Sequence, residues 1–154
     1  GSPRWREVLA FTSIAPIRSV VVGSGTTKAL AGRAPGWEEM LAQDWCLPPR
    51  ATPLRDRFDD LLRERGLALP QQVIELNEFK THAELMQSGS FLGLCSESAG
   101  RALEQSGVAR IVHGPVPELD DDVALFWRSG RPLRPAVRSL RDFLHERAAQ
   151  SGLD

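Results

Sequence analysis

Two short loops carry the side chains of this sequence that are best suited to hold a ligand. The first is Pro49-Arg50-Ala51-Thr52 and the second is Asn77-Glu78-Phe79. Each follows a strand-like run and precedes a helix-like pattern, and helix N-termini offer unpaired N–H groups to anions. Arg50 could pair with a carboxylate while Thr52 and the helix start donate hydrogen bonds to it. The same residue types equally fit a second interpretation, in which Thr52 and Asn77 only cap their helices.

A third loop, Gly23–Lys28 (GSGTTK), partly matches a phosphate-binding loop. Such loops need glycines so that backbone N–H groups can approach a phosphate. Here Lys28 replaces the third glycine of the dinucleotide fingerprint, and no glycine precedes this lysine as the Walker pattern requires. We therefore interpret the segment as a flexible turn and keep phosphate binding as an alternative.

The remaining candidates for catalysis or metal binding lack the necessary partners. Cys46 and Cys95 lie in apolar runs, which is typical of buried, unreactive thiols, and neither has a second thiol or a histidine at metal-ligand spacing. The acidic run Glu118–Asp122 lacks the glycine and the ligand spacing of a calcium loop, so we interpret it as a solvated connector. We expect no catalytic residue, no metal and no cofactor.

Strand-like and helix-like patterns alternate along the chain. Ile17–Val22 is rich in β-branched residues and predicts a buried strand. After Thr52 and Pro53, four apolar residues spaced at i, i+4, i+7 and i+8 predict one buried helical face, which ends at Gly66. A last helix is expected from about Arg134, with Val137, Leu140, Phe143 and Leu144 on its inner face. This alternation predicts an α/β fold with a mostly parallel sheet flanked by helices.

Composition excludes several classes of protein. The chain has 154 residues, of which 42% are hydrophobic and 25% charged, as in ordinary globular domains. With 19 basic and 20 acidic residues it is a poor candidate for binding the phosphate backbone of nucleic acids by itself. No apolar run is long enough to cross a membrane, and no secretory signal is recognisable. The two cysteines lie far apart in the sequence and make no disulfide framework, so we expect a cytoplasmic protein.

Three stretches, taken in order, resemble the C-terminal part of LysR-type transcriptional regulators. The first resembles the family's passage "PLAGR … WEDLA … WVLPP", the second its helix–turn–strand region, and the third its strand, "WR-x-G-R-P-L-x-P" turn and closing helix. In this chain the first stretch is Ala29–Arg33 with Trp37–Leu41 and Trp45–Pro49. The second runs from Pro53–Arg55 through Gly66 to Val73–Glu75, Leu85-Met86 and Gly89. The third is Val123–Pro135 with the helix after it. The chain departs at Thr27–Leu30, where the family usually has "GHPL".

The resemblance implies a fold like that of periplasmic binding proteins, with two α/β lobes and the effector between them. One lobe is then nearly complete and the other partial: residues 1–21 are a strand and crossover from the first lobe, residues 22–112 the second lobe, and residues 113–154 a crossover plus the C-terminal strand and helix of the first lobe. We expect this last strand, Val123–Trp127, and the final helix to lack their usual partners, and so to pack differently or against another chain.

The resemblance also implies a function. The chain would be the effector-sensing domain of a bacterial regulator and not an enzyme, forming homo-oligomers, with promoter DNA contacted only through a helix-turn-helix absent from this sequence and with no membrane partner. The family's effector loops correspond to the two loops above, so the expected site is Pro49, Arg50, Thr52, Asn77, Glu78 and Phe79, holding a small anionic molecule. The alternatives are a solute-binding α/β domain without a transcriptional role, or a small α/β enzyme that uses Gly23–Lys28 on a phosphorylated substrate.

Overall fold

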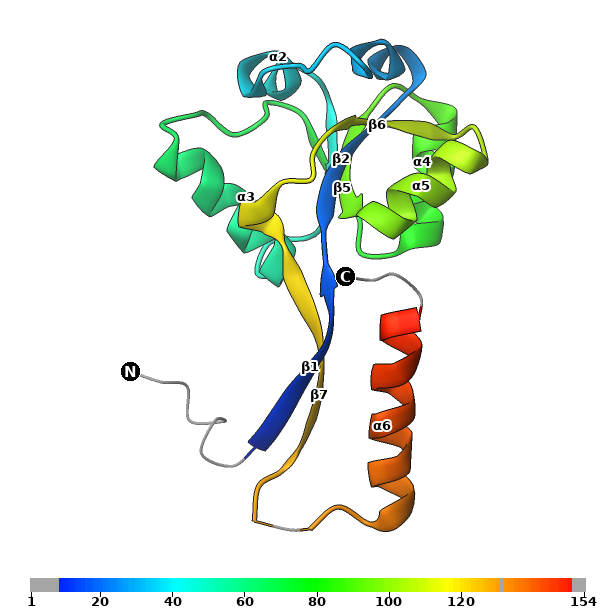
Figure 1. Ribbon diagram of the computed structural model, residues 1–154. Helices are drawn as coiled ribbons and strands as arrows, with labels where there is room; N and C mark the ends of the chain where they lie inside the picture. The colour runs from blue at the N-terminus through cyan, green and yellow to red at the C-terminus, as the bar shows by residue number, and fades with distance from the viewer. Residues whose placement is uncertain (1–8, 131, 151–154) are drawn as a thin grey trace. The chain divides into compact units, whose positions relative to one another are not determined.

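The computed structural model describes residues 9–130 and 132–150, except for the side chains of Phe79 and Gln150. The chain divides into two compact units. The larger consists of residues 18–120, and the smaller contains residues 9–17 and 121–150 among those described. Figure 1 shows the elements of both units, and each unit is described by itself below.

The larger unit is built on a five-stranded sheet with the strand order β4-β3-β5-β2-β6. Strand β3 pairs in parallel with β4 and with β5, whereas β2 is antiparallel to both β5 and β6. Strand β2 therefore runs against the other four, and the sheet is mostly parallel in direction, as predicted. The strands are β2 (Ser19–Ser24), β3 (Trp45–Leu47), β4 (Val73–Glu75), β5 (Leu92–Ser96) and β6 (Ala109–His113).

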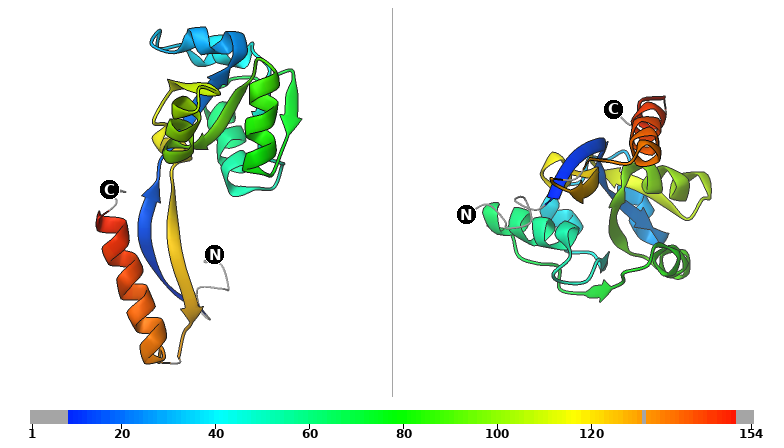
Figure 2. Two further views of the ribbon diagram at one scale, coloured as in Figure 1. Left: turned by 90° about the vertical axis from the view of Figure 1, so that its right-hand side faces the viewer. Right: turned by 90° about the horizontal axis from the view of Figure 1, so that it is seen from below.

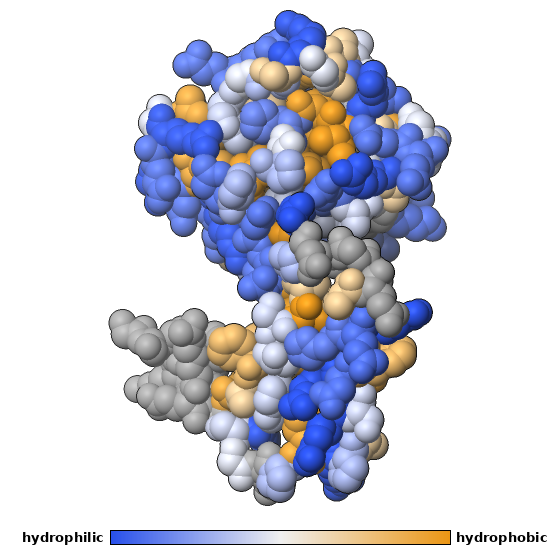
Figure 3. All heavy atoms as spheres, viewed as in Figure 1, coloured by the Kyte–Doolittle hydropathy of each residue, from blue (hydrophilic) through white to orange (hydrophobic). Residues whose placement is uncertain are grey.

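Helices cover both faces of this sheet (Figure 1). On one face, α2 and α3 contribute Met40, Phe58 and Leu62 to a core around Trp45. On the other face, α4 and α5 contribute Met86 and Leu103 to a second, smaller core. Figure 3 shows apolar side chains lying between these helices. The helical elements are η1 (Gly25–Leu30), α2 (Trp37–Leu41), α3 (Pro53–Glu64), α4 (Phe79–Ser88), α5 (Glu97–Gln105) and η2 (Pro117–Leu119), where η marks a 3-10 helix.

The alternation of side chains along β2 explains the two cores. Val20 and Val22 face the second core while Val21 faces the first, because successive residues of a strand point to opposite faces. All residues of β2 are buried, which is the pattern of a strand covered on both sides. The predicted strand Ile17–Val22 is interrupted at Arg18, since β1 of the smaller unit ends at Ile17 and β2 begins at Ser19.

The smaller unit is a two-stranded antiparallel ribbon, β1 (Leu9–Ile17) and β7 (Asp121–Arg128), with α6 (Pro135–Gln150) beside it (Figure 2). Phe11 and Phe126 face each other across the ribbon, with ring centroids 5.8 Å apart. Helix α6 contacts β1, where Thr12 Oγ1 and His145 Nε2 lie 3.3 Å apart.

Large apolar side chains of this smaller unit remain accessible. Val137, Leu140 and Phe143, which the sequence placed on the inner face of the last helix, are all about half exposed, and only Leu144 is partly buried. A two-stranded ribbon offers too little surface to bury an apolar helix face as well as its own side chains. The exposed large apolar residues of the unit are Phe11, Val123, Phe126, Val137, Leu140 and Phe143.

Candidate functional site

Three helices begin at one edge of the five-stranded sheet. Strands β4, β3 and β5 are parallel neighbours, so their carboxyl ends lie at the same edge. Helix α3 follows β3, α4 follows β4 and α5 follows β5, which brings three helix N-termini to that edge. In open α/β sheets, ligands bind beyond the carboxyl ends of the strands, where helix N–H groups point outward. We call the loops at these ends the carboxyl edge.

The first predicted loop, Pro49–Thr52, lies at the carboxyl edge between β3 and α3. Arg50 is exposed, and its Nε lies 3.8 Å from Oε1 of Glu75. The Thr52 hydroxyl donates to the carbonyl oxygen of Pro49 over 2.7 Å. Thr52 is the N-cap residue of α3, as predicted, but its side chain accepts no hydrogen bond from the helix. The Thr52 hydroxyl is thus used in a hydrogen bond within the loop, and the first-turn N–H groups of α3 remain open to solvent or a ligand.

The second predicted loop, Asn77–Phe79, lies between β4 and α4. Asn77 and Glu78 are exposed, and the side chain of Phe79 lies outside the described part of the structure. The N-cap residue of α4 is Glu78, not Asn77 as the capping interpretation required, and it makes no side-chain cap bond. Instead, the Glu78 carboxylate accepts a hydrogen bond from Thr81 Oγ1 over 3.2 Å.

Helix α5 provides a contrast at the same edge. Ser96 is its N-cap residue, and the Ser96 hydroxyl accepts a hydrogen bond from the amide of Ala99. This is the capping role that the residue type favours. Of the three helices that begin at the carboxyl edge, α5 therefore has its cap filled by its own side chain, whereas α3 and α4 do not.

Sequence reasoning missed a buried arginine behind the two loops. Arg55 is only 2% exposed and lies on the core-facing side of α3. Its Nη1 donates to the carbonyl oxygen of Pro48 and to Oε1 of Glu75, both over 3.1 Å, and its Nε donates to Asp59 Oδ1 over 2.9 Å. A signal was present, because Arg55 falls three residues before Phe58 and seven before Leu62, within the buried stripe itself.

The glycine-rich segment Gly23–Lys28 is folded into the end of β2 and the start of a 3-10 helix. Gly25–Lys28 belong to the 3-10 helix η1, and Lys28 Nζ donates to the carbonyl oxygen of Gly107 over 2.7 Å. Gly107 follows the end of α5, where a cation interacts favourably with the helix dipole. Lys28 thus stabilises a helix C-terminus.

The thiols and the acidic run have structural roles. Burial raises the pKa of Cys46 to about 11 and that of Cys95 to about 12, which leaves both thiols protonated near neutral pH. In the acidic run, a backbone hydrogen bond and the neighbouring Arg65 guanidinium lower the pKa of Glu118. Asp120 Oδ1 accepts from the amide of Ser19 over 2.9 Å. Within the described residues, no three His, Cys, Asp or Glu side chains group as metal ligands would.

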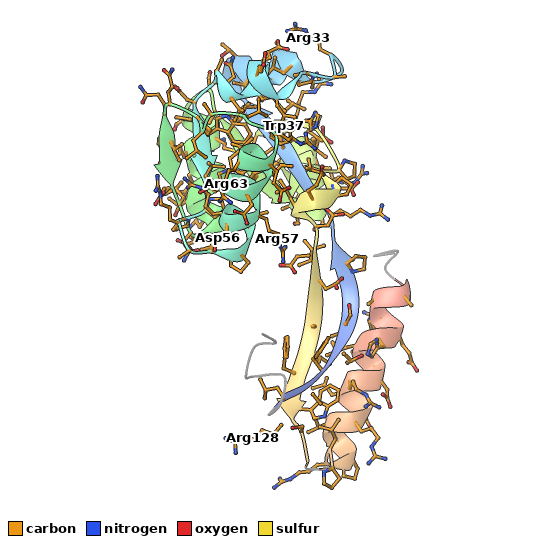
Figure 4. All side chains as sticks on the ribbon, turned by 90° about the vertical axis from the view of Figure 1, so that its left-hand side faces the viewer. Arg33, Trp37, Asp56, Arg57, Arg63 and Arg128 are labelled. Carbon is orange, nitrogen blue, oxygen red and sulfur yellow. The ribbon has the colours of Figure 1, made fainter. Side chains whose placement is uncertain are left out.

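The outer face of α3 carries charged side chains. Figure 4 shows Asp56, Arg57 and Arg63 on this helix. Arg63 pairs with Asp60 over 2.5 Å, and Arg57 donates to the carbonyl oxygen of Asp120.

None of the helices in the described residues is long and apolar enough to cross a membrane.

The larger unit is thus an open α/β domain, with a mostly parallel sheet between two layers of helices and two uncapped helix N-termini at the edge where such domains bind small molecules. The sequence matches the LysR substrate binding domain over residues 2–149. The chain therefore belongs to this family, which comprises the effector-sensing domains of LysR-type transcriptional regulators and is not an enzyme family. Its fold is the periplasmic-binding-protein-like α/β fold predicted from the sequence.

Solved structures support the fold assignment. The regulatory domain of MexT, a transcriptional activator in Pseudomonas aeruginosa, is 18% identical with a TM-score of 0.68, and 90% of this chain aligns with 67% of that one. The regulatory domain of CcmR from Synechocystis in complex with 2-PG is 15% identical with a TM-score of 0.68, covering 95% of this chain and 69% of that one.

A third structure, the effector binding domain of QuiR in complex with shikimate, is 12% identical with a TM-score of 0.73, covering 97% of this chain and 70% of that one. The chain thus spans about two thirds of the length of these structures. No curated protein matched the sequence significantly.

Proposed function

We propose that this domain senses a small anionic effector at the carboxyl edge of its five-stranded sheet. The observation that carries the proposal is that α3 and α4 begin there without a side-chain cap, beside the exposed Arg50. Helix N-termini attract anions, and an arginine can bind a carboxylate through two parallel hydrogen bonds. The proposed effector-binding residues are Pro49, Arg50, Thr52, Asn77, Glu78 and Phe79.

Two of the related structures add chemical context. The CcmR domain was solved with 2-PG and the QuiR domain with shikimate. These molecules suggest the first probes for this chain: shikimate, 2-PG and a panel of simple carboxylates. Binding would change the regulator's state only through different affinities for two arrangements of the protein.

The whole regulator is part of the same proposal. We propose that promoter DNA is bound by a helix-turn-helix domain outside this sequence, that the protein works in the cytoplasm and that this domain catalyses no reaction. Residues 22–112 would form the second lobe, and residues 1–21 and 113–154 would belong to the first. The chain passes from the smaller compact unit to the larger one after Ile17 and returns after Asp120, and these crossing points support the division.

Homo-oligomer formation is proposed on the accessible apolar side chains of the smaller unit. Phe11 and Phe126 are each about half exposed on the ribbon, as are Leu140 and Phe143 on α6. Exposed apolar surfaces of this kind mark association sites. Sedimentation of the chain at increasing concentration should show self-association, which Phe126→Ser and Leu140→Ser should weaken. A monomer at all concentrations would contradict this part of the proposal.

A thermal-shift screen tests the effector site. We expect at least one small carboxylate or phosphate ester to raise the melting temperature, and Arg50→Ala to weaken that binding by about tenfold, as the loss of a charge-assisted hydrogen bond would. Arg33→Ala is the matched control, because Arg33 is also an exposed arginine with a single acidic partner, Glu39. If Arg33→Ala weakens binding as much as Arg50→Ala, the site is not at the carboxyl edge. The domain alone should not shift promoter DNA in a gel.

A further inference from the structure

Arg55 connects three elements at the carboxyl edge. It lies on α3, and it donates to the carbonyl oxygen of Pro48 after β3 and to the carboxylate of Glu75 at the end of β4. Pro48 immediately precedes the loop Pro49–Thr52, and Glu75 lies two residues before Asn77. We call Arg55, Asp59, Glu75 and the Pro48 carbonyl group the Arg55 cluster. Each of the two loops in the proposed effector site thus begins next to an acceptor of the same guanidinium.

Because Arg55 is buried, the hydrogen bonds of its guanidinium are costly to break. Its side chain is 2% exposed, whereas Asp59 is 25% and Glu75 is 41% exposed. A buried guanidinium is tolerated only when its N–H groups are paired, because water cannot replace a lost partner. The planar guanidinium also fixes the directions of its donors, which the single ammonium of lysine does not. The positions of Pro48 and Glu75 are therefore tied to each other through Arg55.

The Arg55 cluster also determines whether the positive charge of Arg50 can interact with an anionic ligand. Oε1 of Glu75 lies 3.1 Å from Arg55 Nη1 and 3.8 Å from Arg50 Nε, so two arginines share one carboxylate oxygen. Arg55 is the closer and the buried partner, while the Arg50 side chain is 74% exposed. If Arg50 turned away to meet an anion, Glu75 would keep Arg55 as its counter-charge. Without Arg55, the carboxylate of Glu75 would hold Arg50 and compete with any anionic ligand.

We propose that Arg55 is the positioning residue of the effector site: through Pro48 and Glu75 it fixes both ligand loops, and by neutralising Glu75 it leaves Arg50 available to an anion. This inference rests on the proposed function for the identity of the site. The positioning itself concerns only residues of the larger unit and is measurable without any effector.

Hydrogen–deuterium exchange of the chain without ligand tests the positioning. In Arg55→Met, the two hydrogen-bonded amides beside the loops, that of Asp56 bonded to Thr52 and that of Leu76 bonded to Leu47, should exchange at least about tenfold faster, as amides of locally opened segments do. Amides of β2, β5 and α5 should keep their rates. Arg55→Lys should show the same pattern more weakly and serves if Arg55→Met does not fold. Arg63→Met is the control, because it removes an arginine of the same helix whose pair with Asp60 is exposed. Unchanged exchange of the Asp56 and Leu76 amides, or a uniform increase across the unit, would overturn the positioning.

Modification of Arg50 by phenylglyoxal, followed by peptide mass spectrometry, tests the charge argument. In Arg55→Met, which removes the charge next to Glu75, Arg50 should react about threefold more slowly, the effect of one surface ion pair, and adding Glu75→Gln should restore the rate. Arg55→Lys keeps a cation there and should slow Arg50 less. Equal rates in all variants would overturn this step. Because Arg50 is exposed in the wild type, accessibility does not limit its reaction. If the loop effects appear but no anion binds the wild-type protein, the proposed effector fails while the role of Arg55 stands.

Discussion

The imidazole of His82 lies directly on the backbone of Gly93. A Cβ atom added to Gly93 would be 2.5 Å from His82 Nε2 and 3.0 Å from its Cε1. His82 belongs to α4 and Gly93 to β5, so the missing side chain of the glycine is what allows the helix to rest on the sheet at this point. Nε2 is buried and, among the described side chains, has no hydrogen-bond partner.

The first prediction concerns this close packing. Gly93→Ala should destabilise the domain by about 1 to 3 kcal/mol, because the new methyl group forces the buried imidazole to move. Urea unfolding measures the loss. In a His82→Ala background the same change should cost much less, since the imidazole is no longer in the way. Equal costs in the two backgrounds would show that His82 is not what Gly93→Ala disturbs.

The second prediction is a pH dependence of stability. Burial lowers the pKa of His82 below its ordinary value of 6.5, so the unfolded chain binds the proton more readily than the folded one. The contribution of neutral His82 is complete above about pH 6.5 and is lost as the pH falls from there through the folded pKa, by at most about 1.4 kcal/mol per pH unit. Urea unfolding between about pH 7.5 and pH 5 measures this slope.

Two variants separate His82 from His145, a histidine of the smaller unit. His82→Gln should reduce the loss of stability on acidification, because glutamine does not titrate. His145→Gln should leave the loss as in the wild type, since His145 lies in the smaller unit beside Thr12. A wild-type slope in His82→Gln would assign the pH dependence to other groups.

The sequence predicted the helices and strands where residue type and periodicity agreed. The apolar spacing after Pro53 gave α3, and Gly66, with φ of 66°, ends it as expected. Ser96 caps α5, the role that its residue type favours. His82 is buried because α4 rests on Gly93, a contact between distant segments that no local sequence pattern records.

The loops of the candidate site were predicted, but not their internal bonds. The residue types of Thr52 and Asn77 favour caps, yet Thr52 bonds Pro49 and the N-cap of α4 is Glu78. The Arg55 cluster depends on a residue 20 positions away, Glu75, which sequence spacing alone does not bring to α3. The apolar spacing of the last helix correctly predicted a helix, but its burial depends on surfaces that the described smaller unit does not provide.

The third prediction concerns Lys28. Lys28→Ala should cost about 0.3 to 1 kcal/mol, the range for a cation at a helix C-terminus, because it removes the bond to Gly107 at the end of α5. Urea unfolding and hydrogen exchange in α5 measure the effect. Nucleotides should not stabilise the wild-type protein. Stabilisation by a nucleotide that Lys28→Ala abolishes would instead favour the enzyme alternative.

The fourth prediction concerns the two cysteines. Because burial raises the pKa of Cys46 to about 11 and of Cys95 to about 12, both thiols should resist a thiol reagent in the folded protein at about pH 8 and react fully in denaturant. Absorbance with Ellman's reagent counts the reacted thiols. Fast reaction of either thiol in the folded protein would show that it is accessible as a thiolate.

The last prediction separates loop geometry from general stability. Ala51, in the first ligand loop, has φ of 64°, and Ala34, outside both loops, has φ of 47°. A side chain is disfavoured in this left-handed region, so glycine at either position should relieve strain and change stability by no more than about 1 kcal/mol, since glycine also makes the unfolded chain more flexible. Calorimetry should therefore show similar, small shifts in melting temperature for Ala51→Gly and Ala34→Gly.

Only Ala51→Gly should weaken binding of the anion found in the thermal-shift screen, because the strained alanine restricts the loop that presents Arg50 and glycine makes this loop more flexible. Equal effects of both variants on binding would mean that Ala51 does not restrict the ligand loop.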